Sequence, residues 1–360
     1  MMKTFIIAEA GVNHNGDLEL AQKLIDAAVD AGADAVKFQT FKAEALASAQ
    51  ADKAAYQKKL TEPEETQIDM LRALELSHES HFRLKAYCDL KGIEFFSTAF
   101  DADSLRFLIE SVGLTRLKIP SGELTNLPFV YQHAESGLPI ILSTGMASID
   151  EIEQSLRVIA GGYAAHAGYD FGHDWNAAYR DARVRAILQA RVHVLHCVSD
   201  YPANDASLNL LAIQTLSETF GLPVGYSDHS LGIWAPVYAL ALGARVIEKH
   251  FTLDKNLPGP DHQASLSPAE LRKMVLDIRK AELAKGSGDK VPQQSELHNR
   301  IPIRKSLVVA EPIAQGEVIL PRHLTAKRPA IGMSPACYWE ILGKPATRSY
   351  AVDDFLDEPL

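Results

Sequence analysis

Two histidines in the sequence could bind one metal ion together. His229 and His250 are 21 residues apart, and each ends a short apolar run typical of a buried β-strand. Neighbouring strands lie about 4.8 Å apart, so two imidazoles at matching heights can share one divalent ion. Two histidines leave coordination positions open, which favours a catalytic metal with bound water over a structural zinc. Two hydrogen-bonded core histidines are the alternative for the same pattern.

Lysines and hydroxyl side chains near other strand-like ends could bind an anion. The lysines are Lys37, Lys118 and Lys249, and the hydroxyls belong to Ser121, Ser143, Thr144 and Ser227. A lysine at such an end can form a Schiff base, bind an anion, or extend its charge into water. Lysines with hydroxyls and backbone amides make a pocket for phosphate or carboxylate. The sequence has no P-loop, which argues against a nucleoside triphosphate.

These residues lie on a chain that alternates strand-like and helix-like segments eight times over its first 284 residues. The strand-like runs are TFIIAE, AVKFQT, IEFFST, RLKIPS, PIILST, VHVLHCV, PVGYSD and RVIEKH. Alternation of this kind predicts parallel strands joined by helices, and eight units predict a (β/α)8 TIM barrel. A doubly wound open sheet is the alternative, but no G-x-G-x-x-G motif follows the first strand.

Every predicted strand ends in polar or ionisable residues. These residues are Glu9, Lys37, Gln39, Ser97, Thr98, Lys118, Ser121, Glu123, Ser143, Thr144, His196, Ser227, Asp228, His229, Glu248 and His250. A single polar strand end is explained by capping of the next helix. Eight such ends favour an active site, because barrel enzymes build theirs at the carboxyl ends of the strands.

The chain is predicted to divide into a barrel domain at 1–285, a linker at 286–304 and a small β-rich domain at 305–360. The linker is polar and carries glycine and proline. Two insertions, at about 42–66 and 160–191, interrupt the barrel pattern. The second contains His166 and His173, which we interpret as surface residues, and its end is expected to be helical.

Composition limits the class of protein. The formal net charge is -10 and no Lys/Arg-rich tract offsets it, which argues against nucleic-acid binding. The three cysteines are far apart in the sequence, as expected for a reducing cytosol. The longest uncharged apolar stretch is about half of the roughly 20 residues that a membrane span needs. We therefore expect a cytoplasmic protein that binds neither nucleic acid nor membrane.

Six blocks, in order, resemble the sialic acid synthase family. They are IAEAGVNHNGD, GADAVKFQTF, KIPSGELTNLP, ILSTGMAS, GYSDHSLG and EKHFTLDKNLPGPDHQASL. The C-terminal segment is similar to the antifreeze-like (SAF) domain of that family, with KRPAIG as its marker. The resemblance covers nearly the whole chain and implies a TIM barrel followed by a SAF domain.

The resemblance implies a condensation of phosphoenolpyruvate with an N-acetylated hexosamine of the manno type. The products would be a nine-carbon 2-keto acid and phosphate. The segments SGELTNLP and YQKKLTEPEETQ resemble the legionaminic acid branch most, whose acceptor is a 2,4-diacetamido-trideoxymannose. N-acetylmannosamine, the acceptor of N-acetylneuraminate synthases, is the first alternative, and a pseudaminate-type sugar is the second.

The resemblance also assigns roles to individual residues. His229 and His250 would hold Mn²⁺ or Mg²⁺, while Glu9, Glu248, His250 and Lys118 would take part in catalysis. Substrate-binding residues would be Lys37, Gln39, Ser121, Ser143, Ser199, Tyr201, Ser227, Asp261 and Arg328. Ser199 stands where the family often carries Asn or Thr.

The same resemblance implies a homodimer in which the SAF domain of one subunit covers the barrel of the other. Arg328 would then reach the N-acetyl group of the sugar in the partner's barrel. Two other functions are alternatives to this one. The first is a barrel aldolase that forms a Schiff base through Lys118, and the second is a sugar- or ice-binding protein. A binding protein does not require a ring of acids, lysines and paired histidines.

Overall fold

The computed structural model describes residues 3–48, 50–53 and 66–357. The chain divides into two compact units, Met1–Gly286 and Ser287–Leu360. Most of the first insertion, including nearly all of the YQKKLTEPEETQ segment, lies outside the described residues.

The first unit is built around eight parallel strands. They are β1 (Phe5–Gly11), β2 (Ala35–Thr40), β3 (Glu94–Ala99), β4 (Leu117–Ile119), β5 (Ile140–Ser143), β6 (Val192–Cys197), β7 (Val224–Asp228) and β8 (Val246–His250). Their order is β3-β2-β1-β8-β7-β6-β5-β4, and the two outermost strands of this order also pack against each other. The sheet therefore closes into the predicted (β/α)8 barrel, and the open-sheet alternative is wrong.

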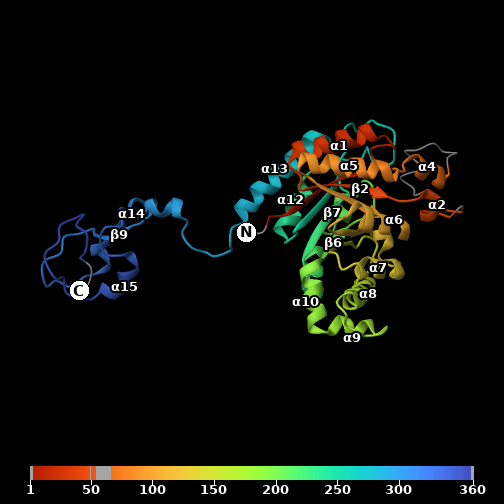
Figure 1. Ribbon diagram of the computed structural model, residues 1–360. Helices are drawn as coiled ribbons and strands as arrows, with labels where there is room; N and C mark the ends of the chain where they lie inside the picture. Colours follow the sequence, from red (N-terminus) through yellow and green to blue (C-terminus); the bar gives the residue numbers. More distant parts are fainter. Residues whose placement is uncertain (1–2, 49, 54–65, 358–360) are drawn as a thin grey trace. The chain divides into compact units, whose positions relative to one another are not determined.

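Helices surround the strands (Figure 1). They are α1 (Leu18–Ala31), α2 (Ala43–Leu46), α4 (Gln67–Ala73), α5 (His78–Lys91), α6 (Ala102–Phe107), η1 (Leu108–Val112), η2 (Ser121–Glu123), α7 (Leu127–Glu135), α8 (Ile149–His166), α9 (Trp175–Arg180), α10 (Ala182–Arg191), η3 (Asp205–Ser207), α11 (Ala212–Phe220), α12 (Trp234–Ala241) and α13 (Pro268–Lys285). Local sequence explains where several begin. Ser148 and Ser267 each form a capping box with the glutamate three residues later.

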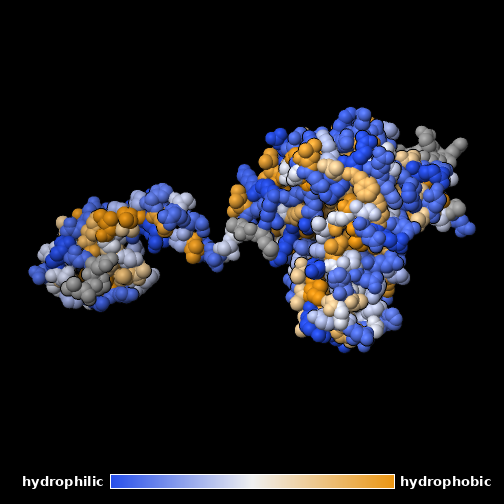
Figure 2. All heavy atoms as spheres, viewed as in Figure 1, coloured by the Kyte–Doolittle hydropathy of each residue, from blue (hydrophilic) through white to orange (hydrophobic). Residues whose placement is uncertain are grey.

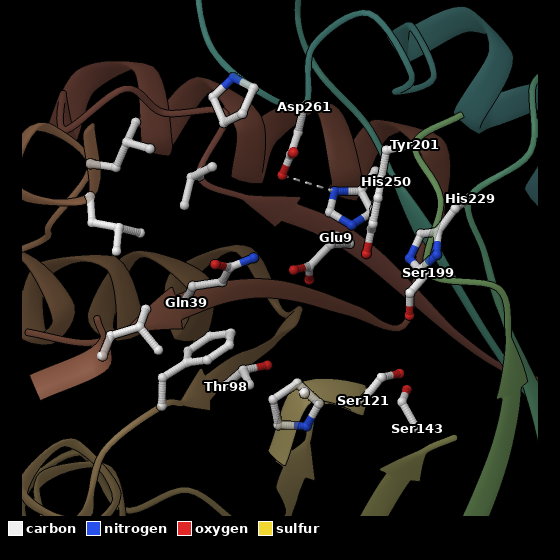
Figure 3. A pocket seen from close by; sticks show the side chains of 18 of the residues that line it. Glu9, Gln39, Thr98, Ser121, Ser143, Ser199, Tyr201, His229, His250 and Asp261 are labelled. Carbon is white, nitrogen blue, oxygen red and sulfur yellow. Dashed lines mark ion pairs between the residues drawn. The ribbon is translucent and has the colours of Figure 1, made fainter. Parts of the chain in front are cut away.

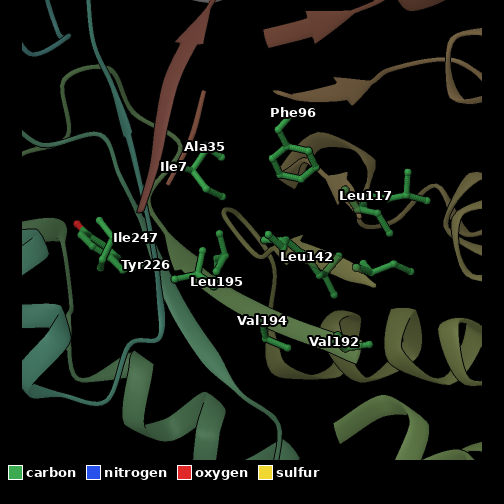
Figure 4. Packing of buried hydrophobic residues seen from close by; sticks show 14 of the residues in the cluster. Ile7, Ala35, Phe96, Leu117, Leu142, Val192, Val194, Leu195, Tyr226 and Ile247 are labelled. Atoms are coloured by element: carbon green, nitrogen blue, oxygen red, sulfur yellow. The ribbon is translucent and has the colours of Figure 1, made fainter. Parts of the chain in front are cut away.

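A single hydrophobic core joins the barrel interior to the helical layer. Figure 4 shows buried side chains of this core from several strands, including Ile7, Leu142 and Val194. Parallel strands read as nearly continuous apolar runs because both of their faces are covered. Polar side chains replace the apolar ones only toward the carboxyl ends of the strands, where the core gives way to the site described below.

The second insertion is largely helical, and its predicted helical end is α10. It continues α8, which extends to His166, and adds α9. Trp175 of α9 packs onto Gly161, where an added Cβ would meet the indole at 2.2 Å. His166 and His173 are exposed, as expected.

The second unit is small and rich in short β-structure, as predicted. Strands β9 (Ser306–Val309) and β10 (Leu324–Lys327) pair antiparallel. Short helices complete the unit: η4 (Gln294–Asn299), α14 (Arg300–Ile303), η5 (Pro321–His323), η6 (Pro335–Cys337) and α15 (Tyr338–Ile341). A separate core, which includes Leu307, Ile313 and Tyr350, holds the unit together. Its assignment as an antifreeze-like domain stays a prediction.

In the view of Figure 2, hydrophobic residues form separate patches among hydrophilic ones. Among the described residues, no helix combines the length and the apolar character that crossing a bilayer requires.

Candidate active site

A cavity of about 590 Å³ opens where the strands end. It is lined by all of the barrel residues predicted to form the site: Glu9, Lys37, Gln39, Lys118, Ser121, Ser143, Ser199, Tyr201, Ser227, His229, Glu248, His250 and Asp261. They come from six strands and from the segments after β4, β6, β7 and β8. Arg328 lies in the second unit, and its part in the site stays a prediction.

Strand alternation decides which residues of β7 and β8 face this cavity. Ser227, His229, Glu248 and His250 line it, as alternate residues on one face of a strand do. Asp228 and Lys249 do not, although both were expected in the ring of polar strand ends. They form an ion pair of 2.6 Å, and both side chains are almost completely buried. Neither residue therefore serves as an anion ligand or a Schiff-base lysine in the cavity.

Four other polar strand-end residues also lie outside the cavity lining and have structural partners. His196 donates from Nε2 to the carbonyl of Leu208 at 2.7 Å, and Thr144 donates to the carbonyl of Leu195 at 2.9 Å. The other two are Ser97, which shares a hydrogen bond with Thr40, and Glu123, which accepts one from Asn126. Polarity at a strand end was thus insufficient to identify a site residue.

One lysine lies between two carboxylates at the base of the cavity. Lys37 Nζ is 3.2 Å from Glu9 Oε2 and 3.2 Å from Glu248 Oε2. Burial raises the pKa of Glu9 to about 7, although Lys37 opposes the rise. Burial also disfavours the charged form of Glu248, but Lys118 and Lys37 outweigh it and hold that pKa below its usual range. The two carboxylates therefore differ: Glu248 is ionised near neutral pH, while Glu9 can hold or release a proton.

Lys118, the second lysine of the cavity, joins Glu248 to the hydroxyl of Ser143. Lys118 Nζ donates to Ser143 Oγ at 2.7 Å and lies 3.5 Å from Glu248 Oε1. Ser227 donates to the same glutamate oxygen at 2.8 Å. Burial lowers the pKa of Lys118, and Glu248 opposes this effect. Lysines, hydroxyls and Glu248 thus form one connected network across β2, β4, β5, β7 and β8.

A glycine brings a backbone amide into the same area. Gly145 N donates to Ser121 Oγ at 3.0 Å, and Ser121 Oγ lies 3.1 Å from Cys197 Sγ. A Cβ at Gly145 would fall 2.3 Å from Ser199 Oγ, so this close approach needs glycine. Figure 3 shows Ser121 and Ser143 beside each other in the cavity. The sequence patterns did not identify Gly145 or Cys197 as part of the site. The one signal was the glycine inside ILSTGMAS, since a glycine after a strand can indicate a close backbone approach.

The two histidines adopt a state suited to binding a metal. Their ring centroids are 5.5 Å apart. His229 Nδ1–H donates to the carbonyl of Val198 at 2.7 Å, which leaves the lone pair of Nε2 available. Burial lowers the pKa of His229 and, more strongly, that of His250, so both rings are neutral. Neutral imidazole is the form that coordinates metals.

His250 also has a ring nitrogen that could coordinate a metal ion. Its Nδ1 is buried, finds no hydrogen-bond partner in the described part of the chain, and lies 3.8 Å from Asp261 Oδ2 (Figure 3). The Tyr201 ring lies 4.1 Å from that of His229 and 5.8 Å from that of His250. Within the described ranges, no group of three or more His, Cys, Asp or Glu is arranged to hold a metal. The histidine pair would therefore leave most coordination positions to water or substrate.

Apolar residues missed by the sequence reasoning complete the cavity. They are Val12, Leu46, Ala47, Met70, Leu71, Leu74 and Phe100, and we call them the outer wall; the polar residues Ser48, Asp52 and Gln67 line the cavity beside them. Met70, Leu71 and Leu74 recur at helical spacing, which predicts a buried helix face but gives no information about what the face covers.

Comparison with known proteins assigns the family. The model of the NeuB family matches residues 24–290, about three quarters of the chain.

The chain belongs to the NeuB family.

Relatives and a solved structure agree with this assignment. N,N'-diacetyllegionaminic acid synthase of Campylobacter jejuni is 47% identical over 358 residues, covering 99% of this chain and 100% of that protein. The synthase of the same name from Legionella pneumophila is 46% identical over 342 residues, covering 95% and 90%. The N-acetylneuraminic acid synthetase of Leptospira borgpetersenii, crystallised with citrate, is similar in structure. Its TM-score is 0.68 at 36% identity, covering 82% of this chain and 90% of that one.

Proposed function

We propose that this NeuB-family protein condenses phosphoenolpyruvate with the open-chain form of 2,4-diacetamido-2,4,6-trideoxymannose. The products are N,N'-diacetyllegionaminate and phosphate. The observation that carries the proposal is the full-length similarity to two N,N'-diacetyllegionaminic acid synthases, at 46% and 47% identity. The lysines, serines and paired histidines of the cavity support it, because they match the charges and groups of these substrates.

The lysine side of the cavity suits phosphoenolpyruvate. Lys37 and Lys118 supply charge, while Ser121, Ser143 and Ser227 supply hydroxyl groups. The amide of Gly145 holds Ser121 in place, and Ser199 lies next to that glycine. Hydrogen bonds that involve charged groups contribute about 1.5–3 kcal/mol each. These groups orient the carboxylate and phosphate and stabilise phosphate as it leaves.

The histidine side suits a divalent ion. His229 Nε2 and the ring of His250 would hold Mn²⁺ or Mg²⁺, which when bound would polarise the sugar aldehyde and orient a water molecule. The buried, unpartnered Nδ1 of His250 and the fixed tautomer of His229 support this assignment. Gln39, Tyr201 and Asp261 line the adjoining part of the cavity and would bind the sugar.

The two glutamates have separate tasks in the proposed reaction. A carbon–carbon bond forms between C3 of phosphoenolpyruvate and C1 of the sugar, water adds at C2, and phosphate departs. Glu9, whose pKa is raised to about 7, can give a proton to the aldehyde oxygen as it becomes a hydroxyl. Glu248 stays ionised and orients Lys37, Lys118 and Ser227.

A homodimer with a shared site is the proposed assembly. Arg328 precedes Pro329, which restricts its backbone, and would reach the acetamido group of a sugar in the partner's barrel. Mixing an Arg328→Ala subunit with a His250→Ala subunit tests this. If the site is shared, activity partly returns on subunit exchange; no recovery after proven exchange would contradict it.

Phosphate release from phosphoenolpyruvate tests the reaction and identifies the acceptor. The assay compares 2,4-diacetamido-2,4,6-trideoxymannose, N-acetylmannosamine and the pseudaminate precursor, each with Mn²⁺ and with Mg²⁺. We expect the first sugar to give the highest kcat/KM. Preference for N-acetylmannosamine would instead make the enzyme an N-acetylneuraminate synthase. Borohydride inactivation in the presence of pyruvate, lost in Lys118→Met, would support the Schiff-base aldolase.

A further inference from the structure

The loop after β1 carries polar residues to which the proposed reaction gives no role. This loop contains the sequence NHNGD, residues 13–17, and its first residue, Asn13, is almost completely buried. Asn13 does not line the cavity, although the preceding residue, Val12, does. Buried polar side chains are held by hydrogen bonds, so the partners of Asn13 indicate what it does.

The side-chain nitrogen of Asn13 donates two hydrogen bonds to the segment after β8. Asn13 Nδ2 lies 2.8 Å from the carbonyl oxygen of Phe251 and 2.9 Å from Ser265 Oγ. Ser265 Oγ in turn donates to the carbonyl of Asp261 at 2.6 Å. The direction of each bond is defined, because the serine hydroxyl has a single hydrogen and gives it to Asp261. Asn13 therefore supports the backbone of Asp261 through Ser265.

Asp261 depends on such contacts because it lies outside the regular elements. β8 ends at His250 and α13 begins at Pro268, and the described residues between them form no helix and one isolated bridge, from Phe251 to Leu266. The Asp261 carboxylate nevertheless lines the cavity, with Oδ2 3.8 Å from His250 Nδ1 (Figure 3). A shift of this segment would move the carboxylate relative to the histidine pair.

A second asparagine of the loop contacts the same segment. Asn15 Nδ2 donates to the carbonyl of Pro258 at 2.9 Å. Gly259 comes so close to Asn15 that an added Cβ would lie 2.9 Å from Asn15 Oδ1. The loop after β1 thus packs tightly on the segment that carries Asp261, and the hydrogen bonds that lead to Asp261 itself start at Asn13.

We infer that Asn13 and Ser265 are positioning residues for the acceptor sugar: they hold the backbone of Asp261 so that its carboxylate reaches the sugar. This inference rests on the proposed function, in which Asp261 binds the sugar. Neither Asn13 nor Ser265 lines the cavity, so each acts through Asp261 without touching the substrate. Asparagine suits this place because its one nitrogen donates twice, whereas an ionised aspartate can only accept.

Ser265→Ala tests the last bond of this chain. The change removes the hydroxyl that holds Asp261 and leaves the other acceptor of Asn13, the carbonyl of Phe251, unaltered. We expect the KM for 2,4-diacetamido-2,4,6-trideoxymannose to rise about tenfold, the factor for one hydrogen bond with a charged group. The kcat and the KM for phosphoenolpyruvate should change by less than about twofold, as expected when only binding of the sugar is weakened.

Tyr163→Phe is the control for the loss of one buried hydrogen bond. Tyr163 donates to the carbonyl of Leu138 at 2.7 Å and does not line the cavity. This variant should leave both KM values unchanged. Circular dichroism checks that each variant is folded.

A double-mutant cycle shows whether the two residues act through Asp261. Asp261→Ala alone should raise the KM for the sugar, and adding Ser265→Ala should raise it no further, whereas independent effects would multiply. Asn13→Asp keeps the size of the side chain but removes both donated hydrogens. It should raise the KM for the sugar at least as much as Ser265→Ala does, and it should likewise add nothing to Asp261→Ala.

The outcomes separate this inference from the proposed function. The inference is overturned if Ser265→Ala and Asn13→Asp leave the KM for the sugar unchanged, or if they raise the KM for phosphoenolpyruvate equally. It is also overturned if Asp261→Ala leaves the KM for the sugar unchanged, or if its effect multiplies with theirs. Each of these results leaves the proposed reaction standing. If the unmodified protein releases no phosphate with any of the three sugars, the proposed function fails, and this inference fails with it.

Discussion

Replacing Lys249 with methionine should destabilise the barrel strongly. Lys249 Nζ donates to Asp228 Oδ2 at 2.6 Å and also to the carbonyl of Ser230, and both charged side chains are at most 1% exposed. Lys249→Met leaves the carboxylate buried without its counter-ion. Breaking a buried ion pair from one side costs about 3–5 kcal/mol.

The remaining contacts of Asp228 place the expected cost within that range. Its Oδ1 still accepts from the Tyr226 hydroxyl at 3.0 Å and from the Ser230 amide at 2.9 Å. Only Asp228 Oδ2 loses its partner, so we expect the loss of stability to lie at the lower end of this range, about 3 kcal/mol. Asp228→Asn combined with Lys249→Met removes both charges and should cost less than the single change, because no uncompensated charge stays buried.

Urea unfolding measures this cost. Far-UV circular dichroism follows the barrel unit, which contains every helix longer than six residues among those described. Lys255→Met is the control, since Lys255 and Glu270 form an equally short but partly exposed pair, and such pairs contribute at most about 1 kcal/mol. If Lys249→Met costs no more than Lys255→Met, or if the double variant is as unstable as Lys249→Met, the reasoning is refuted.

Four further predictions concern the cavity and the second insertion. His229→Ala should abolish Mn²⁺ binding in calorimetry while the circular dichroism spectrum stays unchanged; retained binding would contradict the metal assignment. Lys118→Met should weaken phosphoenolpyruvate binding about tenfold or more, by loss of one charged contact, and unchanged affinity would exclude that contact. Because burial raises the pKa of Glu9 from 4.5 to about 7, the folded protein keeps a proton that the unfolded chain has lost. The contribution of Glu9 to the unfolding free energy therefore falls by up to about 3 kcal/mol as pH rises between these values. Glu9→Gln should remove this pH dependence of the unfolding free energy, and an unchanged pH dependence would refute the prediction. Trp175→Ala removes a partly buried indole and should lower stability by about 1–3 kcal/mol without changing kcat/KM, and a specific loss of turnover would show that the second insertion serves the cavity.

The barrel and the inner part of its site were predictable because both follow from short-range rules. Eight apolar runs separated by amphipathic segments predict parallel strands with helical crossovers, and strand ends then meet at one face. The same rules grouped residues such as Glu9, Lys118 and His250, which are far apart in the chain. Polarity alone could not tell Lys249 from its neighbours, because the direction of a side chain depends on its place in the strand alternation.

The outer wall and the contact at Gly145 were not predictable in this way. Met70 and Leu74 form an ordinary buried helix face in the sequence, and only the packing of α4 on α2 brings that face to the cavity. The role of Gly145 depends on two hydroxyls, at Ser121 and Ser199, that approach from other loops. Both features arise from contacts between segments distant in sequence, about which local patterns carry no information.

The shared lysine at the base of the cavity has a consequence for competition among ligands. Lys37 lies between Glu9 and Glu248, and Lys118 also lies beside Glu248, so the protein's own carboxylates pair with both lysines. An incoming anion has to exchange partners with these carboxylates rather than enter a bare positive site. Abundant simple anions such as chloride gain little from that exchange, whereas phosphoenolpyruvate offers a carboxylate and a phosphate on one rigid frame. For the proposed phosphoenolpyruvate site, we therefore expect these internal ion pairs to disfavour simple anions relative to a ligand that carries two anionic groups.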